Sequence, residues 1–502
     1  MPTAAAPVCK AGRSVTLEGR LPPTKADSYK LLPFKVARGV NSLEVTYSYT
    51  DGDTVLDLGI WDEDGAFEYK GFRGWSGSRQ GRRDDLDGDG EPDQPPVIIQ
   101  ADEASKNFIP ARVRRGRWRI ELGVGAIGDD GADYSVKVRC RKVKVGPLPA
   151  PDPVDPAHVA NPEPGWYFGD FHMHAFHSNL NAPTQTEFVE FARDAGLDFF
   201  PITEYQINRH WSEWGTTARA NPDLIFWPGR EVITYFGHAG VLGETPGMVE
   251  YRHGYKGISM ADIQSGSVER GALFQINHPT TFPPPLDHLC RGCVWELDDA
   301  IDYAKVHAIE VVNVGVQRPG DGFPNPFVET AIDFWEDKLL QGYHIAPTGG
   351  SDDKLGPNYG IPATAVFADE LSRGALQEAV DAGHVWIATR GVAQSPQIEF
   401  SATAAGETAI FGDTLASDTA EFTVTVEGGQ GHTLYIYRDG ENVETVPIAS
   451  DDFAHEFTGT ATATDNLLGS YYRIETREAV IGNAQVPGLL STLGMPIFLK
   501  AP

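Results

Sequence analysis

The sequence predicts a multidomain protein in which a central α/β unit is flanked by two all-β units. Short runs that alternate apolar and polar residues, separated by Gly, Pro and Asp turns, occur near both ends of the 502-residue chain. A proline-rich stretch follows the first set of runs. Beyond it, strand-like runs alternate with helical patterns, which is typical of a parallel α/β arrangement.

Residues 1–145 are predicted to form an N-terminal β-sandwich domain. The runs 42–49 and 134–139 alternate in the way that half-buried strands do. Cys9 and Cys140 lie near the two ends of this unit, where terminal strands could pair. We expect a disulfide between them, with two buried free thiols as the alternative.

One loop of this unit has the residues of a calcium site. Carboxylates at alternate positions, with Gly90 at the sixth, match the D-x-D-x-D-G pattern of calcium loops. Pro96 stands at the twelfth position, where an EF-hand has a bidentate Glu, so the loop is no complete EF-hand. We expect a structural Ca²⁺ site, with a solvated acidic loop as the alternative, and the candidate ligands are Asp85, Asp87, Asp89, Glu91 and Asp93.

Residues 146–165 form a stiff Pro-rich linker, and residues 166–394 form the α/β domain. Helices are expected at 184–195 and 326–340. Residues 395–502 alternate again, as in the strand candidates 397–402 and 421–426, and predict a C-terminal β-sandwich domain. The strands expected in the α/β domain are 167–174, 197–202, 224–231, 239–243, 272–278, 308–314 and 343–349.

The formal net charge is −29, and the acidic excess lies almost wholly after residue 145. Such a surface repels nucleic acid and anionic membranes, so we expect no nucleic-acid partner. No apolar run is long enough to span a membrane. Residues 1–7 lack the apolar core of a signal peptide and look like the start of a mature chain whose leader was removed. With the expected disulfide, this favours a secreted or periplasmic protein.

Side chains that bind metals gather at the expected strand ends of the α/β domain. His172 and His174 are two residues apart, so on a strand both project from one face. In a barrel of parallel strands, residues at the carboxyl ends converge in space. A metal site is therefore predicted from a set that is scattered along the chain: His172, His174, Glu204, Glu231, His238, His278, Glu310 and Asp352.

These residues lie in motifs that resemble the PHP (polymerase and histidinol phosphatase) superfamily of metallohydrolases. The motifs are D-F-H-M-H at 170–174, I-T-E-Y at 202–205, P-G-R-E at 228–231, G-H-A-G-V-L-G at 237–243, N-H-P at 277–279, A-I-E-V-V-N at 308–313 and G-S-D at 350–352. The flanking β-domains and residues 71–77 look most like the carbaryl-hydrolase (CehA-type) branch. The resemblance implies a distorted seven-stranded β/α barrel with up to three metal ions.

The resemblance implies two metal-ligand sets that share a carboxylate. His172, His174, Glu231 and Asp352 match the first set, and Glu231 would bridge to a second ion that His238 and His278 also hold. The expected cofactors are two divalent transition-metal ions, Zn, Mn or Fe. Asp170 is a candidate for fixing the histidine tautomers.

The positions of the third metal depart from the family pattern together. Asn179, Tyr205 and Lys354 stand where the family has Asp, His and His. We expect two metals, with Lys354 supplying the missing positive charge and Tyr205 and Asn179 supplying hydrogen bonds; His177 could partly compensate. Glu204 and Glu310 are candidate bases or supporting carboxylates, with a purely structural role as the alternative.

The expected function is binuclear, metal-dependent hydrolysis of an ester-type bond in a small-molecule substrate, with phosphoesters first. A carbamate, carboxyl ester or amide is the second expectation, and a binding module with a degenerate barrel is the third. Cys290 and Cys293, with His288 nearby, supply three ligands where a zinc knuckle needs four. A small disulfide-closed loop at the rim of the site is therefore favoured. The sequence does not determine the oligomeric state.

Overall fold

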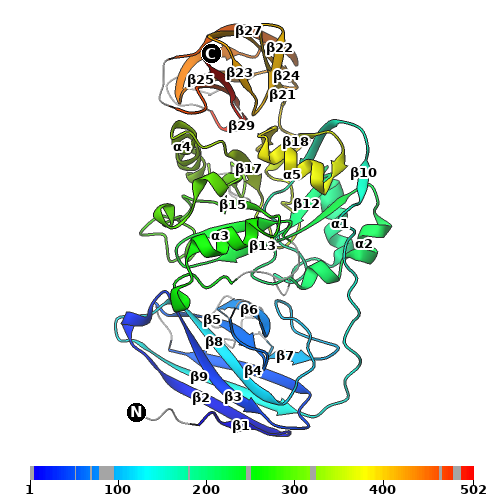
Figure 1. Cartoon of the computed structure of the whole chain (residues 1–502), viewed down its shortest axis with the longest axis vertical. Helices are drawn as coiled ribbons and strands as arrows, with labels where there is room; N and C mark the ends of the chain where they lie inside the picture. The colour runs from blue at the N-terminus through cyan, green and yellow to red at the C-terminus, as the bar shows by residue number, and fades with distance from the viewer. Residues whose placement is uncertain are drawn as a thin grey trace.

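The computed structural model describes residues 5–50, 53–67, 70–78, 95–178, 181–244, 250–316, 324–462, 466–478 and 488–501. Figure 1 shows three parts along the long axis of the molecule: N-terminal strands at one end, mixed strands and helices in the middle, and C-terminal strands at the other end. The candidate calcium ligands at 85–93 and Asn179 lie outside the described residues. The calcium site therefore stays a prediction.

The N-terminal part consists of two sheets whose inner side chains form one buried cluster. Alternate residues point into this core, as Val136 and Val138 do in β9. Cys9 in one sheet and Cys140 in the other are joined, which confirms the expected disulfide. The sheets are β1 (Val8–Cys9), β3 (Ser28–Val36), β8 (Gly116–Ala126), β5 (Val55–Trp61) and β6 (Phe72–Ser78), and β2 (Arg13–Leu21), β9 (Ala132–Arg141), β4 (Ser42–Tyr49) and β7 (Val97–Gln100).

Seven strands of the middle part lie in chain order across one sheet, and six of them run parallel. The expectation of an all-parallel arrangement is wrong for β14, which pairs antiparallel with both neighbours. The reason is local: a short turn at 234–237 folds β14 directly back onto β13. The strands are β11 (Gly165–Gly169), β12 (Phe199–Ile202), β13 (Ile225–Ile233), β14 (His238–Leu242), β15 (Leu273–Asn277), β16 (Ala308–Asn313) and β17 (Ala346–Gly350).

Backbone hydrogen bonds join the carboxyl ends of the first and last of these strands. The Phe171 amide donates to the Gly349 carbonyl at 3.2 Å, and the Asp352 amide donates to the His172 carbonyl at 2.6 Å. The His174 amide donates to the Asp353 carbonyl at 3.1 Å. Except for Gly349, which belongs to β17, these residues lie just beyond the ends of β11 and β17. The seven-stranded barrel itself stays a prediction.

The helices begin where the sequence provides caps. Thr184 and Glu187 form a capping box at the start of α1, and Ser259 and Asp262 form another at the start of α3. The two expected helices agree with α1 and α4 to within one residue at each end. The α-helices are α1 (Gln185–Asp194), α2 (Gly215–Ala220), α3 (Met260–Val268), α4 (Phe327–Leu340) and α5 (Arg373–Asp381).

The sheet of the middle part continues into the C-terminal part. β11 pairs with β18 (Ala363–Ala368), and β18 pairs with β20 (Val385–Ala388). β20 then pairs with β29 (Leu490–Gly494), so hydrogen bonds cross the domain boundary expected at 394. β29 leads on to β28 (Ser470–Glu478), β25 (His432–Arg438) and β26 (Glu441–Pro447), and β30 (Ile497–Lys500) links β28 to β23 (Thr414–Ala416).

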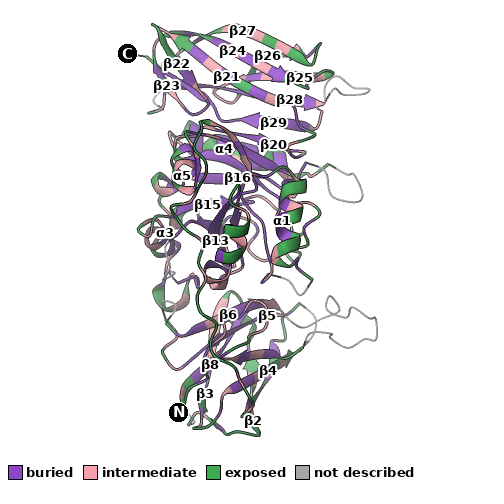
Figure 2. Ribbon diagram, turned by 90° about the vertical axis from the view of Figure 1, so that its right-hand side faces the viewer, coloured by how far each residue is buried: buried purple, intermediate pink, exposed green. Residues whose placement is uncertain are grey.

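A separate sheet packs on this extension and completes two layers. Its strands are β22 (Glu407–Ile410), β21 (Gln397–Ala404), β24 (Thr419–Glu427) and β27 (Asp452–Thr460). Stacked phenylalanines such as Phe400 and Phe422 belong to the same buried cluster as the middle part. Figure 2 shows the buried inner positions alternating with exposed ones along these strands.

Part of the predicted linker is ordered against the middle part. β10 (Val159–Asn161) pairs antiparallel with β19 (Leu371–Ser372). Within the described part of the chain, no helix is long and apolar enough to cross a membrane. The domain boundaries predicted at 145, 165 and 394 stay predictions.

The N-terminal part contacts the segments that follow β11 and β12. The Arg209 Nη1 donates to the Phe108 carbonyl at 2.9 Å, and the Asn107 side chain donates to the Ser178 carbonyl at 3.5 Å. The Trp75 ring lies 6.2 Å from the Tyr205 ring, measured between centroids. The N-terminal part therefore borders the region where the strand ends carry the predicted ligands.

Candidate metal centre

The H-x-H segment follows the end of β11, and Met173 between the two histidines still bridges to Ile202 at the end of β12 and to Asp353. The structure ends β11 at Gly169, so the expected strand 167–174 is shorter than predicted. His172 and His174 are both buried, and their ring centroids are 5.3 Å apart. A Cβ on Gly350 would lie 2.3 Å from the Cβ of His172, so only glycine lets β17 approach the segment this closely.

The carboxylate of Glu231 lies at the centre of the four histidines. Its Oε1 is 3.4 Å from His172 Nε2, 3.3 Å from His238 Nδ1 and 3.4 Å from His278 Nε2. Its Oε2 is 3.5 Å from His174 Nε2. These separations exceed the roughly 2.7–3.2 Å of good hydrogen bonds, so the nitrogens surround the carboxylate without forming short hydrogen bonds to it.

The predicted ligands fall into two groups that share Glu231. The first is His172, His174, Glu231 and Asp352, and the second is Glu231, His238 and His278; in each, the ligand atoms lie within 4.8 Å of one another. Ligand atoms of His172, His278 and Glu310 also lie within 4.8 Å of one another. The structure thus brings together all six residues that the sequence predicted as metal ligands.

In three of the four histidines, the outer ring nitrogen, which faces away from Glu231, contacts a specific partner. His172 Nδ1 is 3.0 Å from Glu310 Oε2, His174 Nδ1 is 2.9 Å from Ser178 Oγ, and His238 Nε2 is 2.9 Å from the Arg291 carbonyl. The other nitrogen of each ring faces the carboxylates. His172 Nε2 is buried and has no hydrogen-bond partner among the described residues. A ring nitrogen fixed toward carboxylates can hold a proton or, once deprotonated, bind a divalent metal ion.

Two ligands depend on unusual backbone positions. His278 follows β15 with φ of 32°, and Asp352 follows β17 with φ of 48°. Both values lie in the left-handed region, which non-glycine residues seldom adopt. His238 is the first residue of β14, and because β14 runs antiparallel its amino end lies beside the carboxyl ends of β13 and β15.

The electrostatics of the centre keep its carboxylates ionised. Burial alone would raise the pKa of Glu231, but His172 and the other histidines hold it well below its usual range. Burial likewise opposes ionisation of Asp352, yet Lys354 and His172 hold its pKa well below the usual range. The pKa of His172 is raised well above its ordinary value, because Glu310, Glu231 and Asp352 outweigh the effect of burial. The carboxylates thus attract positive charge, which a proton on His172 or a divalent cation can supply.

Lys354 and Tyr205 lie together beside the first group. Lys354 Nζ is 2.6 Å from Asp352 Oδ1 and donates to the Asp352 carbonyl at 2.9 Å. It lies 5.6 Å from the centroid of the Tyr205 ring, and that ring is 4.2 Å from the His174 ring. Burial raises the pKa of Tyr205, so its hydroxyl keeps its proton. Asn179, the third member of the predicted corner, is not among the described residues.

Other residues predicted at the site lie near the candidate ligands without belonging to the two ligand groups that share Glu231. Glu204 accepts from the His177 amide at 2.8 Å and from the Ser178 hydroxyl, and so supports the partner of His174. Asp170 accepts from the His172 amide at 3.1 Å and from the Ser351 amide at 3.0 Å. Burial raises the pKa of Asp170 to about 7. His177 Nε2 pairs with Glu213 at 2.8 Å, outside the metal-ligand groups found in the described part of the chain.

Sequence reasoning missed three groups that contact the ligands. Ser178 could have been found, because it follows the H-x-H motif by four residues and could fold back on it. Asn277, whose amide lies 3.3 Å from Glu231 Oε1, precedes a predicted ligand by one residue. Nothing in the sequence marks the Arg291 carbonyl, since every residue has a backbone carbonyl.

Comparisons with known proteins find similarity in structure, but no match to a family model or a curated sequence. A two-domain protein from Bacteroides vulgatus containing a predicted PHP-like metal-dependent phosphoesterase is 16% identical, with 69% of this chain and 99% of that chain covered and a TM-score of 0.37.

Two further structures are similar over shorter stretches. A lesion-specific endonuclease from Pyrococcus furiosus is 15% identical over 45% of this chain and 58% of its own, with a TM-score of 0.29. An amidohydrolase from Chromobacterium violaceum is 15% identical over 37% of this chain and 87% of its own, with a TM-score of 0.26. All three scores lie below 0.5, so the conclusions below rest on the residues of this chain.

Proposed function

We propose that this protein is a binuclear, divalent-metal-dependent hydrolase of the PHP type. The observation that carries the proposal is Glu231, one buried carboxylate shared by two groups of metal-binding side chains. A random association of polar residues would not leave the inner nitrogens of several histidines aimed at a single carboxylate. We also infer that β11 to β17 close into the distorted barrel, in line with the bonds between the ends of β11 and β17.

His172, His174, Asp352 and Glu231 would hold the first ion, and Glu231, His238 and His278 the second. Divalent ions bound there supply Lewis acidity and lower the pKa of water, which makes a nucleophile available near neutral pH. Zn, Mn and Fe all accept this mixture of imidazole and carboxylate ligands. Two ions rather than three are expected. Lys354 and Tyr205 stand where the family has histidines, and neither side chain would bind a metal ion as an imidazole does.

The chain itself orients the ligands and provides a positive charge for the substrate. Glu310 and Ser178 fix which nitrogen of His172 and His174 is presented to the ion. Lys354 would bind an anionic oxygen of the substrate or stabilise the leaving group, and its contact with Asp352 beside the first ligand group supports this role. The neutral phenol of Tyr205, beside it, can donate a hydrogen bond.

A phosphoester is the substrate class that the site supports best. Lys354 adds a cation to two metal positions, and this combination suits the negatively charged oxygens of a phosphoryl group. A carbamate, carboxyl ester or amide is the second candidate, because the sequence resembles the carbaryl-hydrolase branch. A small molecule is the expected substrate; the absence of a nucleic-acid partner stays a prediction from the acidic surface.

The test is hydrolysis of a panel by protein loaded with Mn²⁺ or Zn²⁺. The panel is p-nitrophenyl phosphate, bis-p-nitrophenyl phosphate, p-nitrophenyl acetate and 1-naphthyl N-methylcarbamate. Turnover of either phosphate ester ahead of the others supports the leading proposal, and turnover of the carbamate or acetate first selects the second. No turnover of any compound at full metal loading would favour a binding module and overturn the proposed function.

We further propose that the protein works outside the cytoplasm. Two disulfides, Cys9–Cys140 and Cys290–Cys293, support this proposal, because such bonds persist in oxidising compartments. The cellular location can be measured by fractionating the host cells. Recovery in the cytoplasmic fraction with reduced thiols would contradict it.

A further inference from the structure

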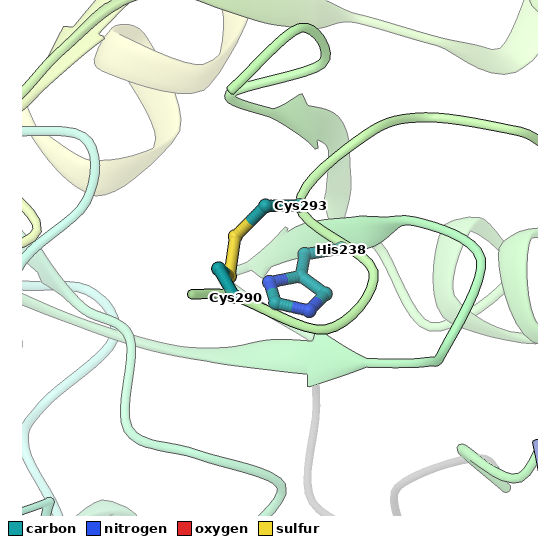
Figure 3. Close-up of side chains that lie close together, drawn as sticks. All are labelled: His238, Cys290 and Cys293. Carbon is teal, nitrogen blue, oxygen red and sulfur yellow. A yellow bond between two sulfur atoms is a disulfide. The ribbon is translucent and has the colours of Figure 1, made fainter. Parts of the chain in front are cut away.

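The four-residue loop Cys290–Cys293 lies directly against a candidate metal ligand. Its two cysteines are joined by a disulfide, which confirms the disulfide-closed loop expected from the sequence. Figure 3 shows the disulfide beside the ring of His238. The two sulfurs and a nitrogen of His238 lie within 4.8 Å of one another. This loop is therefore part of the surroundings of the second metal position.

The loop determines which nitrogen of His238 is free. The Arg291 carbonyl, inside the disulfide ring, is 2.9 Å from His238 Nε2. A carbonyl can only accept, so Nε2 carries the proton and Nδ1 keeps its lone pair. Nδ1 is the atom that lies 3.3 Å from Glu231 Oε1. The carbonyl thus selects the tautomer that can bind the second ion.

Close packing holds the loop in this place. Gly292 has φ of 80°, and a Cβ there would lie 2.1 Å from the Thr234 carbonyl oxygen. The Glu296 amide donates to the Phe236 carbonyl at 2.7 Å, and the Trp295 amide donates to the Pro279 carbonyl at 2.8 Å. The loop is therefore docked on the turn that leads into His238 and on the chain that leaves His278.

We propose that the disulfide-closed loop is a positioning device for His238, and that opening the disulfide weakens the second metal site. This inference rests on the proposed function, because it assigns His238 to the second ion. The ring restricts residues 291 and 292, so the carbonyl stays on Nε2 at little entropic cost. Once the disulfide is reduced, the loop can move and Nε2 loses its fixed acceptor. Cys290 is partly exposed, whereas Cys9 and Cys140 are fully buried, so a reductant reaches the loop first.

The reduction is a two-electron step with a defined balance. With a water-soluble trialkyl phosphine, phosphorus attacks one sulfur and the S–S bond breaks. Water hydrolyses the resulting adduct, so that two thiols and one phosphine oxide form. The phosphine is oxidised and the disulfide is reduced.

The main experiment measures Zn²⁺ binding to the metal-free protein in two steps, by equilibrium dialysis with elemental analysis. Loss of an outer hydrogen-bond partner typically weakens metal affinity by about 10–100-fold. We expect this loss for the second ion alone in the Cys290→Ser/Cys293→Ser double variant, with the affinity for the first ion unchanged. Leu289→Ala is the matched control, since Leu289 is an exposed neighbour of the loop (42%). The control should bind both ions as the wild type does.

A second variant separates the position of the loop from the chemistry of its sulfurs. Gly292→Ala keeps the disulfide but forces residue 292 away from Thr234. It should weaken the second ion in the same way. Wild-type protein treated with the phosphine, with two thiols counted and Cys9–Cys140 shown intact by mass spectrometry, provides a comparison without any substitution. Here Mn²⁺ replaces Zn²⁺ for both the oxidised and the reduced protein, because the freed thiols beside His238 would themselves bind Zn²⁺.

The outcomes distinguish this inference from the proposed function. If the wild type binds two ions and the variants and reduced protein bind the second equally well, the positioning role is wrong. If the wild type binds fewer than two ions at saturation, the proposed binuclear centre is wrong instead. Should the double variant fail to fold, the reduced wild type and Gly292→Ala still decide the question.

Discussion

Each imidazole of the centre has two nitrogens, and the residue that holds the outer one decides what the inner one can do. Glu310, Ser178 and the Arg291 carbonyl perform this task for His172, His174 and His238. They are one charged carboxylate and two neutral acceptors, a hydroxyl and a carbonyl, so the three imidazoles will differ in basicity. His278 has no such partner for its Nδ1 among the described residues.

Replacement of Glu231 by Ala should abolish binding of both ions and all hydrolysis, because both ligand groups include this carboxylate. His238→Ala is the matched variant and should lose only one ion, since His238 belongs to one of those groups. The measurement is metal content per chain after reconstitution and removal of excess metal. Two ions retained by Glu231→Ala would mean that Glu231 is an ordinary strand residue.

Replacement of Lys354 by Ala should lower kcat/KM by roughly 10²-fold while both ions stay bound. Charge stabilisation inside an active site is worth a few kcal/mol, and Lys354 is the cation that contacts Asp352. Lys305→Ala is the control, because the Lys305 side chain is 43% exposed, pairs with Asp302 at 3.8 Å and belongs to none of the candidate ligand groups of the described residues. Unchanged turnover of the best panel substrate by the Lys354 variant would exclude the role proposed for this lysine.

At the scale of elements, one reversed strand completes the centre. β14 brings its first residue to the side where β13 and β15 end, so His238 reaches Glu231 although it begins a strand. The turn before β14 also meets the N-terminal part: the Tyr235 hydroxyl donates to Asp57 Oδ2 at 2.8 Å, and its ring stacks on Tyr29 at 5.5 Å. This turn thus connects the metal centre to a neighbouring sheet.

The contact between β5 and this turn makes stability depend on pH. Burial raises the pKa of Asp57 to about 7, despite the hydrogen bond from Tyr235. In the unfolded chain the pKa is about 3.9. Below the pKa of the unfolded chain, the carboxyl is neutral in both states and does not change the free energy of unfolding. As pH rises toward 7, only the unfolded state releases the proton, so the stability of the folded state falls. Above pH 7 this loss of stability is complete.

Asp57→Asn should therefore stabilise the protein at pH 8 and have little effect at pH 4. The gain at pH 8 is on the order of 3–4 kcal/mol as an upper value, from the difference between the two pKa values. The measurement is the urea midpoint of wild type and variant at both pH values. An equal effect at pH 4 and pH 8 would show that ionisation of Asp57 is not the cause.

At the scale of the whole molecule, a buried ion cluster joins the N-terminal and middle parts. Arg252 Nη1 lies 2.7 Å from Glu121 Oε2, and Arg252 Nη2 lies 2.6 Å from Glu250 Oε2. The guanidinium lies 4.2 Å from the centroid of the Trp61 ring. Arg252 and Glu121 are completely buried. Because both side chains are shielded from the surface, the charge left behind when one partner is lost is poorly solvated.

Arg252→Ala should destabilise the protein by about 3–5 kcal/mol, since Glu121 would be left as a buried charge without its cation. Arg193→Ala is the control: its pair with Asp223 at 2.6 Å is exposed, with 42% and 58% of the side chains accessible. Exposed pairs contribute about 0–1 kcal/mol. Thermal unfolding of both variants checks the difference, and equal melting temperatures would mean that the cluster does not hold the two parts together.

The sequence by itself determined the types of many elements and which side chains would meet at the candidate centre. Apolar periodicity and proline-rich breaks are local signals, so they placed α1, α4 and most of the strands that were proposed within a few residues. The candidate metal ligands were predicted because histidine and carboxylate at strand ends are few and chemically specific, and the resemblance to the PHP superfamily divided them into two sets. What only the tertiary structure decided are contacts between distant segments: the reversal of β14, the sheet that crosses residue 394 and the Arg291 carbonyl on His238. A backbone carbonyl and a strand direction have no side-chain signature, and their positions follow from packing of the whole chain.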